Sequence, residues 1–222
     1  MEDQRLRQQK ELSKIALSIL GGGYALAGSG AIREHGLTDR YTEDIDLFGS
    51  YEAQEGFPDA ADQLVDGLRE AGYDVEVYRR TNHFMTLVAE KDGLAQQIDM
   101  GIDYREHPPK RLSVGPVLDV SDAVANKVCA VFSRGYPRDY IDLESIRRNS
   151  GFSDDELVGL AMSADPGFAE DLFAQALLQA AALEPGQVER YGVTTEDLDS
   201  MKRSLCSWAD DLLARTAPAS GC

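Results

Sequence analysis

The sequence contains few cysteines and no long apolar run. Its three cysteines are an odd number, and no two have the spacing of a metal-binding pair, which is typical of a chain kept in a reducing compartment. No apolar stretch approaches the roughly 20 residues that a membrane-spanning helix needs. Residues 1–14 are charged and lack the apolar core of a signal peptide. We therefore expect a cytoplasmic protein with no membrane contact.

Basic residues are also scarce. Lysine and arginine together number 22, against 39 aspartates and glutamates, which gives a net charge of −17. This charge argues against binding nucleic acid over a broad surface, because the phosphates would be repelled. The window 127–148 differs from the rest, with five basic residues and three acidic ones. Contact with nucleic acid is therefore expected only in a local basic cleft.

The order of patterns along the chain predicts an α+β fold. Helical periodicity appears first in residues 4–20, and short strand-like stretches then alternate with helices up to about residue 103. After the turn-rich residues 105–116 every pattern is helical, beginning with a helix over 122–133 that Ser121 is expected to cap. We predict a small mixed β-sheet core flanked by helices over residues 1–115, and a helical C-terminal module over residues 116–222.

Two aspartates interrupt an apolar strand at residues 44–48. In a strand alternate side chains share a face, so Asp44 and Asp46 point to one side and Ile45 and Leu47 to the core. Carboxylates about 7 Å apart along one face repel each other unless a positive charge lies between them. Hard oxygen ligands suit Mg²⁺. The alternative is a solvated strand face with Arg40 as the counter-ion.

A third aspartate occupies a similar position in a later strand. Asp99 lies between Ile98 and Met100, so its side chain is expected to leave the opposite face from these apolar neighbours. If the two strands pair, three carboxylates converge, as phosphoryl-transfer sites with divalent metals require. Asp103 is a rival for this position. An aspartate on an edge strand, without a metal, is the other interpretation.

A small-residue turn precedes the first aspartate pair. Gly28, Ser29 and Gly30 lie between a strand and a short helix, where backbone N–H groups can approach a phosphate without obstruction by a Cβ. The turn is neither a P-loop nor a dinucleotide fingerprint. A plain turn is the alternative.

The segment ANKVCAVFSRGYPRDYIDLESIRR contains charged residues on two helices. Lys127 lies at the margin of an apolar helical stripe, so it either extends outward to solvent or points into a cleft. Asp139 and Asp142 are three residues apart and share a face of the next helix. Arg138 can form a local ion pair with Asp142.

These motifs together resemble the AbiEii/MenT nucleotidyltransferase toxin family, within the polymerase-β-like nucleotidyltransferase superfamily. The resemblance rests on Gly28-Ser29, on Arg40-x-Thr42-x-Asp44-Ile45-Asp46-Leu47, and on Lys127 followed by RDYIDL. It implies that Gly28 and Ser29 hold the triphosphate of a nucleotide, and that Asp44 and Asp46 bind the metal. Fourteen residues separate Ser29 from Asp44, slightly more than is usual in the superfamily.

The resemblance also implies roles for the later residues. Lys127 would contact nucleotide phosphate, and Asp142 would be the essential late aspartate, with Asp139 as its rival. Arg40 and Thr42 would support the metal pair. Asp99 is the expected third metal ligand, and Arg138 is a supporting residue. The expected cofactor is Mg²⁺, with Mn²⁺ as an alternative, and a nucleoside triphosphate is the expected substrate.

The implied activity is transfer of a nucleoside monophosphate to the 3′ end of tRNA by a toxin that blocks translation. A cognate antitoxin protein is the expected partner. An alternative is transfer to a small hydroxylated molecule such as a cationic antibiotic, which the acidic charge favours, or to a protein side chain. The other alternative is a non-catalytic nucleotide-binding module. The residues do not choose among the four nucleotides.

Overall fold

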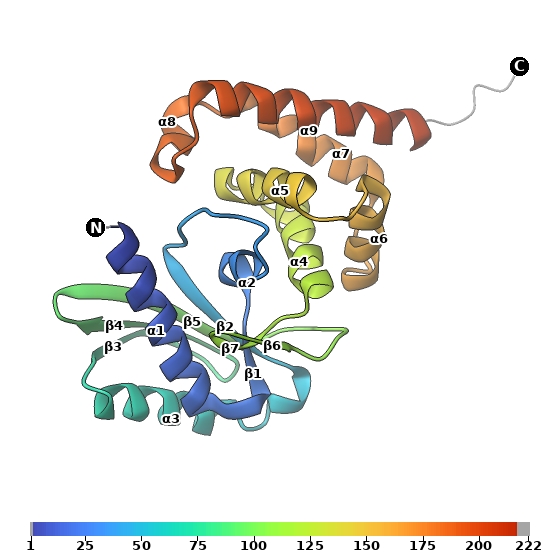
Figure 1. Ribbon diagram of the computed structural model, residues 1–222. Helices are drawn as coiled ribbons and strands as arrows, with labels where there is room; N and C mark the ends of the chain where they lie inside the picture. The colour runs from blue at the N-terminus through green and yellow to red at the C-terminus, as the bar shows by residue number, and fades with distance from the viewer. Residues whose placement is uncertain (1, 217–222) are drawn as a thin grey trace, which may run out of the picture. The chain divides into compact units, whose positions relative to one another are not determined.

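The chain forms two compact units, and the computed structural model describes residues 2–216. The first unit contains the chain up to His35 together with Tyr41–Ala123, and the second contains Gly36–Arg40 together with the chain from Val124. The predicted α+β class is confirmed, since a mixed sheet is the centre of the first unit and helices make up the second (Figure 1). Within residues 2–216, no helix combines the length and the apolar character needed to cross a bilayer.

The sheet of the first unit is mixed. Its strands are β1 Tyr24–Leu26, β2 Asp44–Gly49, β3 Asp74–Arg80, β4 Phe84–Lys91, β5 Leu94–Ile102, β6 Lys110–Leu112 and β7 Gly115–Val117. Among the described residues, seven strands follow the order β3-β4-β5-β2-β1-β7-β6. β2 runs parallel to β5 and β1 runs parallel to β7, whereas the other neighbouring strands are antiparallel. The strands that carry Asp46 and Asp99 therefore do pair, which is the condition for the three carboxylates to converge.

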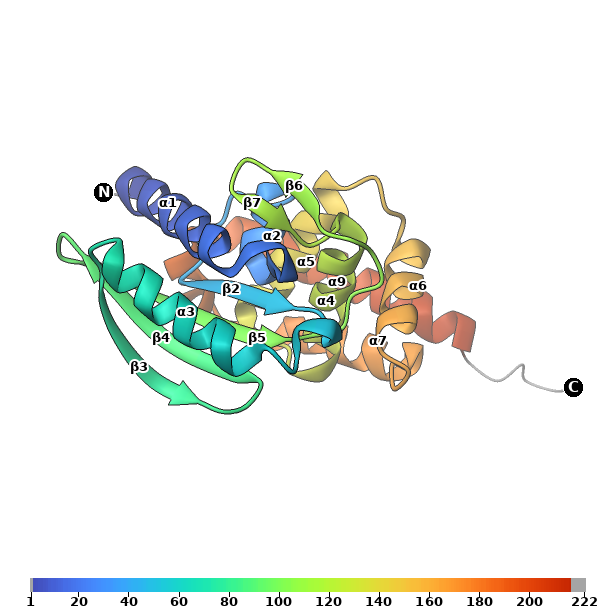
Figure 2. The same cartoon turned by 90° about the horizontal axis from the view of Figure 1, so that it is seen from below.

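Two helices cover one face of this sheet. α1 spans Glu2–Leu20 and α3 spans Phe57–Glu70, and Figure 2 shows them side by side against the strands. They approach closely at Gly67, where a Cβ would lie only 2.8 Å from Ile19 Cδ1. Burial of apolar side chains between helices and sheet stabilises this core. Strand residues in it, each at most 1% exposed, are Ile45, Leu47, Met85, Leu87, Ile98 and Met100.

Shorter elements complete the first unit. A seven-residue helix, α2 (Gly28–Glu34), follows β1, and 3₁₀ turns occupy Gly21–Gly23 and Tyr51–Ala53. Helix α3 ends at Glu70, and Gly72 just beyond it adopts a positive φ of 85° that favours glycine.

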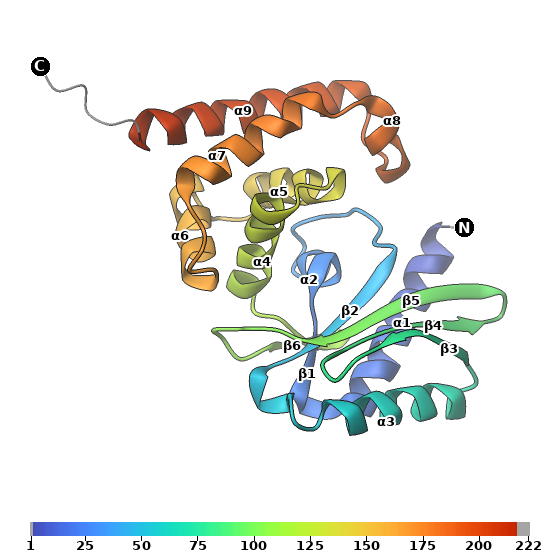
Figure 3. The same cartoon turned by 180° about the vertical axis from the view of Figure 1, so that it is seen from behind.

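The second unit is made of helices. Its first helix, α4, begins in the last residues of the first unit. The helices are α4 Val120–Ser133, α5 Pro137–Asn149, α6 Asp154–Ala164, α7 Glu170–Leu178, α8 Pro185–Val188 and α9 Thr195–Thr216, with 3₁₀ turns at Gln179–Ala182 and Glu189–Tyr191. α7 and α9 run side by side (Figure 3). Phe173 and Trp208 join them edge to face, with ring centroids 5.2 Å apart.

Three details differ from the sequence prediction. The turn-rich stretch 105–116 contains β6 and the start of β7, two strands too short to show a period of two. Helix α4 begins at Val120, and its cap is Asp119 instead of Ser121, since Asp119 Oδ1 accepts a hydrogen bond from the Ser121 N–H at 3.0 Å. The part of the chain after residue 116, predicted as helical throughout, also contains 3₁₀ turns at Gln179–Ala182 and Glu189–Tyr191.

Candidate active site

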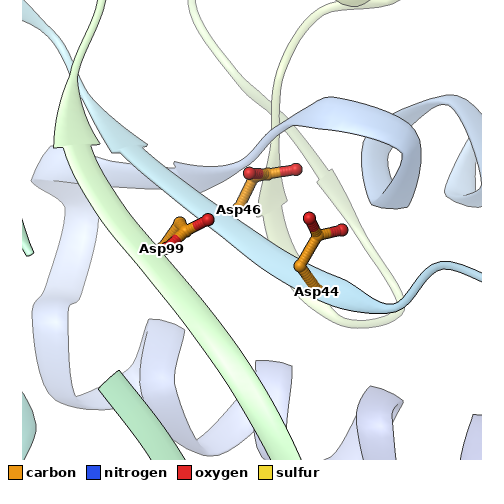
Figure 4. Close-up of side chains that lie close together, drawn as sticks. All are labelled: Asp44, Asp46 and Asp99. Atoms are coloured by element: carbon orange, nitrogen blue, oxygen red, sulfur yellow. The ribbon is translucent and has the colours of Figure 1, made fainter. Parts of the chain in front are cut away.

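Three carboxylates meet on β2 and β5. The parallel pairing of these strands sets Asp46 directly opposite Asp99. Asp44 lies two residues before Asp46 and on the same face of the sheet. One carboxylate oxygen from each residue lies within 4.8 Å of the others, and all three side chains are half-buried. Figure 4 shows the three carboxylates on the same side of the two strands. This group, Asp44, Asp46 and Asp99, is called the acidic triad below.

Neutral hydrogen bonds orient the third carboxylate. Thr86 on β4 is paired with Asp99, and its hydroxyl donates to Asp99 Oδ1 at 2.7 Å. The amide of Gln97 donates to Asp99 Oδ2 at 3.1 Å. Because both donors are uncharged, the negative charge of Asp99 is held in place without being cancelled.

A glutamine from α1 fixes the start of β2. The Gln9 amide donates to the carbonyl oxygen of Thr42 at 2.9 Å and to that of Asp44 at 3.3 Å. The Thr42 hydroxyl donates to Gln9 Oε1 at 3.2 Å. Gln9 and Thr42 are at most 2% exposed, so the backbone that presents Asp44 is held from inside the protein.

The small-residue turn packs against Asp46. The Ala27 N–H donates to the carbonyl oxygen of Asp46 at 2.8 Å. Gly28 has a positive φ of 55°, and a Cβ on it would lie 1.8 Å from Asp46 Oδ2. Only glycine fits this position, because any side chain would displace the carboxylate. Ser29 follows as the second residue of α2 and is buried.

In the second unit, Lys127 is buried in an ion-pair network. Only 5% of the residue is exposed, so the outward orientation considered from the sequence is wrong. Its Nζ lies 2.9 Å from Asp142 Oδ2 and 3.6 Å from Asp139 Oδ1. The ammonium group is therefore oriented by two carboxylates of α5.

Asp142 is buried and forms ion pairs with two basic side chains, Arg40 and Lys127. It has no exposed surface, and Arg40 donates to both of its oxygens at 2.8 Å from Nε and from a terminal nitrogen. Burial by itself would raise the pKa of Asp142, but Lys127 and Arg40 outweigh it and lower the pKa to about 2. Asp142 is therefore charged at neutral pH and acts on its surroundings through Lys127 and Arg40.

Asp139 is enclosed in a similar way. Arg134 donates to its two oxygens at 2.9 and 3.0 Å, and the residue has no exposed surface. Burial tends to raise the pKa of Asp139, and the hydrogen bond from Arg134 and the charge of Lys127 lower it overall. The Arg138 guanidinium lies 5.5 Å from the ring centroid of Tyr136.

The predicted residues thus fall into two groups. Gly28, Ser29, Thr42 and the acidic triad belong to the first unit. Arg40, Lys127, Arg138, Asp139 and Asp142 belong to the second.

Sequence reasoning did not identify Gln9, Thr86 and Gln97, which hold the triad or its backbone. Gln9 interrupts an apolar helical stripe, which is a signal that a buried polar contact leaves in a sequence. Thr86 alternates with Met85 and Leu87, and this alternation would have placed it on the same face as Asp99.

A cavity of about 510 Å³ lies elsewhere in the first unit. Its wall includes Leu12 from α1 and Ala89 and Gln96 from β4 and β5. Ala89 leaves the opposite face of β4 from Thr86, since their positions differ by three, an odd number. The cavity is therefore on the helix-covered face, and the candidate active site is the acidic triad on the other face.

Comparison with known proteins agrees with this geometry. No curated protein sequence matches the chain closely. The crystal structure of JHP933 from Helicobacter pylori is similar, with a TM-score of 0.57, 17% identity, and 96% of this chain and 93% of that chain covered. A crystal structure from H. pylori described as that of a candidate nucleotidyltransferase has a TM-score of 0.61 and 18% identity, and 97% of both chains is covered. At these identities the two structures show a shared fold.

The family is shown by the sequence itself. The pattern that defines the family described as "Nucleotidyl transferase AbiEii toxin, Type IV TA system" matches residues 11–205, which confirms the resemblance found from the motifs. This match includes the small-residue turn, the acidic triad, Lys127 and the two buried aspartates of α5. The chain belongs to the AbiEii nucleotidyltransferase toxin family and is a nucleotidyltransferase.

Proposed function

We propose that this nucleotidyltransferase uses Mg²⁺ to transfer a nucleoside monophosphate from a nucleoside triphosphate to the 3′ end of tRNA, and that this blocks translation. The acidic triad is the observation that carries the proposal. Three half-buried carboxylates within 4.8 Å of one another, in a chain of this family, supply the ligands for phosphoryl transfer assisted by a divalent metal.

The donor set fits Mg²⁺. All three groups are carboxylates, the hard oxygen ligands that Mg²⁺ prefers, and Mn²⁺ accepts the same ligands. Asp44, Asp46 and Asp99 would hold the metal, and the charge of a cation would offset their mutual repulsion. When bound, the metal would neutralise phosphate charge and lower the pKa of the attacking hydroxyl.

The small-residue turn is assigned to the nucleotide. Gly28 has no side chain to lie against Asp46 Oδ2, so a phosphate can approach this carboxylate from the turn. Ser29 is the next residue, and its backbone and hydroxyl are assigned to the triphosphate. Gln9 and Thr42 keep the start of β2 in place while substrate binds.

Lys127 and Asp142 are assigned related roles. Lys127 is proposed to contact nucleotide phosphate and to offset charge on the leaving pyrophosphate. Asp142 has no exposed surface, so we assign it to positioning Lys127, with Arg40 as its second partner. Asp139, held by Arg134, is assigned the supporting part.

The family implies a partner, whereas the acceptor is part of our proposal. It is a family of toxins from type IV toxin–antitoxin systems, which implies a cognate antitoxin. We propose tRNA as the acceptor, since a block in translation by nucleotide transfer needs a target in the translation machinery.

A label-transfer assay tests the proposal. The protein is incubated with Mg²⁺, total tRNA and each α-labelled nucleoside triphosphate in turn, and the product is separated on a denaturing gel. A labelled band that RNase removes and protease leaves is the expected result, and it identifies the nucleotide. A band removed by protease, or label found only on an added aminoglycoside, would replace tRNA with another acceptor. Transfer that persists fully in EDTA would contradict the metal requirement.

A further inference from the structure

The face of the sheet that carries the acidic triad continues beyond Asp99 to the edge of the sheet. β5 is followed by β4 and then by the edge strand β3. The register aligns Asp46, Asp99, Thr86 and Arg79 in one row across these four strands. Helices α1 and α3 cover the opposite face, as Figure 2 shows. Thr86 is half-buried and Arg79 is exposed, so this row leads from the triad to solvent.

Two aromatic rings lie beside this row. Phe48 on β2 and Phe84 on β4 flank Gly101, which faces Phe48 in β2 and Phe84 in β4 across the strand pairs. A Cβ on Gly101 would lie 2.8 Å from Phe48 and 3.2 Å from Phe84, so both rings lean over the glycine. Phe48 and Phe84 are half-buried. They therefore form a partly exposed apolar surface on the same face of the sheet as Asp46 and Asp99, two residues further along β2 and β5.

An arginine adds positive charge to this surface. The Arg79 guanidinium lies 5.4 Å from the centroid of the Phe84 ring. Among residues 4–215, whose side chains the structure describes, no carboxylate forms an ion pair with Arg79. The next residue, Arg80, points to the other face and pairs with Asp62 at 2.6 Å. The two adjacent arginines therefore lie on opposite faces of the sheet. Arg79 is on the face that carries the acidic triad, and Arg80 is on the face covered by helices.

We propose that Phe84 and Arg79 bind the unpaired terminal nucleotides of an RNA acceptor and present its 3′ end to the acidic triad. A base stacks on an exposed aromatic ring without sequence preference, and a guanidinium beside the ring can contact the adjoining phosphate. A strongly acidic protein needs such a local site to hold RNA. This inference rests on the proposed function, because it names the surface that the acceptor uses.

The sheet order separates this surface from the nucleotide turn. β2 has β1 on one side and β5 on the other. The turn at Gly28 follows β1, whereas Phe84 and Arg79 lie beyond β5. In phosphoryl transfer the attacking and leaving oxygens are roughly in line across the phosphorus. With the triphosphate at Gly28, the attacking hydroxyl therefore comes from the β5 side, where Phe84 and Arg79 lie.

The experiment compares RNA affinity with nucleotide affinity in the full chain. Fluorescence anisotropy measures binding of total tRNA and of a labelled single-stranded RNA pentamer with a free 3′-OH, and a competition assay measures binding of each nucleoside triphosphate. The variants are Arg79→Ala, Phe84→Ala and Phe84→Leu, the last of which keeps the apolar volume. Arg80→Ala is the matched control from the opposite face. Circular dichroism checks that each variant is folded.

We expect Phe84→Ala and Phe84→Leu to weaken RNA binding roughly tenfold, the usual effect of losing one stacked base. Arg79→Ala should weaken it and lower the salt dependence by about one phosphate contact. Arg80→Ala should change neither, and nucleotide binding should be unchanged in every variant. A loss of nucleotide affinity with unchanged RNA affinity would overturn the inference and assign the surface to the nucleoside triphosphate.

The two proposals can fail separately. If the wild type labels tRNA but the four variants keep its affinity for RNA, the surface is wrong and the proposed function stands. If the wild type labels no RNA while the Phe84 and Arg79 variants bind RNA more weakly, the proposed function is wrong and the surface stands. Equal affinities of all variants for RNA overturn the inference in either case.

Discussion

The two units use aspartate in opposite ways. In the first unit, Asp44, Asp46 and Asp99 are half-buried close to one another, and the hydrogen-bond donors on Asp99 are neutral. In the second unit, Asp139 and Asp142 are fully buried, and arginine and lysine enclose them. A carboxylate held by neutral donors, as Asp99 is, keeps its charge available to a cation, whereas Asp139 and Asp142 already have their charge compensated. Burial and partners, rather than residue type, separate the two roles.

Removal of a triad carboxylate should give the largest effect on activity. Asp46→Asn is expected to slow nucleotide transfer by at least about 10³-fold, because a metal ligand worth several kcal/mol to the transition state is lost. Single-turnover transfer with saturating Mg²⁺ measures it. Asp103→Asn, which changes the rival carboxylate beyond β5, is the matched control and should retain activity. Similar losses in both variants would contradict the assignment of the triad.

Removal of a compensated carboxylate should instead affect stability. Asp142→Asn is expected to lower the free energy of unfolding by about 3–5 kcal/mol, because Arg40 and Lys127 are buried and lose the carboxylate that they share. Asp44→Asn should leave stability unchanged or slightly higher without metal, because it relieves repulsion within the triad. Urea unfolding in EDTA compares the two. Equal destabilisation would remove the distinction between the two groups of aspartates.

Loss of the hydrogen bond that orients Asp99 should have a smaller effect on metal-dependent activity. Thr86→Val keeps the shape of the side chain but removes the hydroxyl that donates to Asp99 at 2.7 Å. Loss of such a partner typically costs 10- to 100-fold in metal affinity or activity, and we expect about tenfold here. The measurement is the Mg²⁺ concentration that gives half-maximal transfer. Thr81→Val is the control, because the Thr81 hydroxyl bonds Phe84 and His83 within its own turn. An unchanged Mg²⁺ requirement would contradict the role of Thr86.

The convergence of the triad could be predicted because alternation along a strand is a local property. Asp44, Asp46 and Asp99 alternate with apolar residues, so their faces follow from the sequence once β2 and β5 are assumed to pair. The environment of Lys127 could not be predicted in this way. Its partners are on another helix, and Arg40, the second partner of Asp142, is 102 residues away in the chain. Contacts of this kind depend on tertiary packing, which periodicity does not encode.

The same distinction explains the smaller errors in the fold. The helices α1 and α4 show helical periodicity in the sequence, and both were predicted within two residues of their observed bounds. β6 and β7 have three residues each and are defined by their partners, so no local pattern marks them. Gln9 is similar, since its role depends on backbone carbonyls of β2 that lie far away in the sequence.

The pKa of Asp142 gives a last prediction, on the pH dependence of stability. Its pKa falls from 3.8 to about 2 on folding, so the folded state binds this proton less readily than the unfolded state. The stabilisation is therefore complete above about pH 4 and is lost as the pH falls from about 4 towards 2, by roughly 2 kcal/mol for a shift of this size. Urea unfolding from pH 5 down to the lowest accessible pH should show the wild type losing stability faster than Asp142→Asn, which has no carboxyl to protonate. Asp44→Asn should follow the wild-type slope, since it leaves the buried network unchanged. Parallel pH profiles for the wild type and Asp142→Asn would show that Lys127 and Arg40 do not hold Asp142 in its charged form.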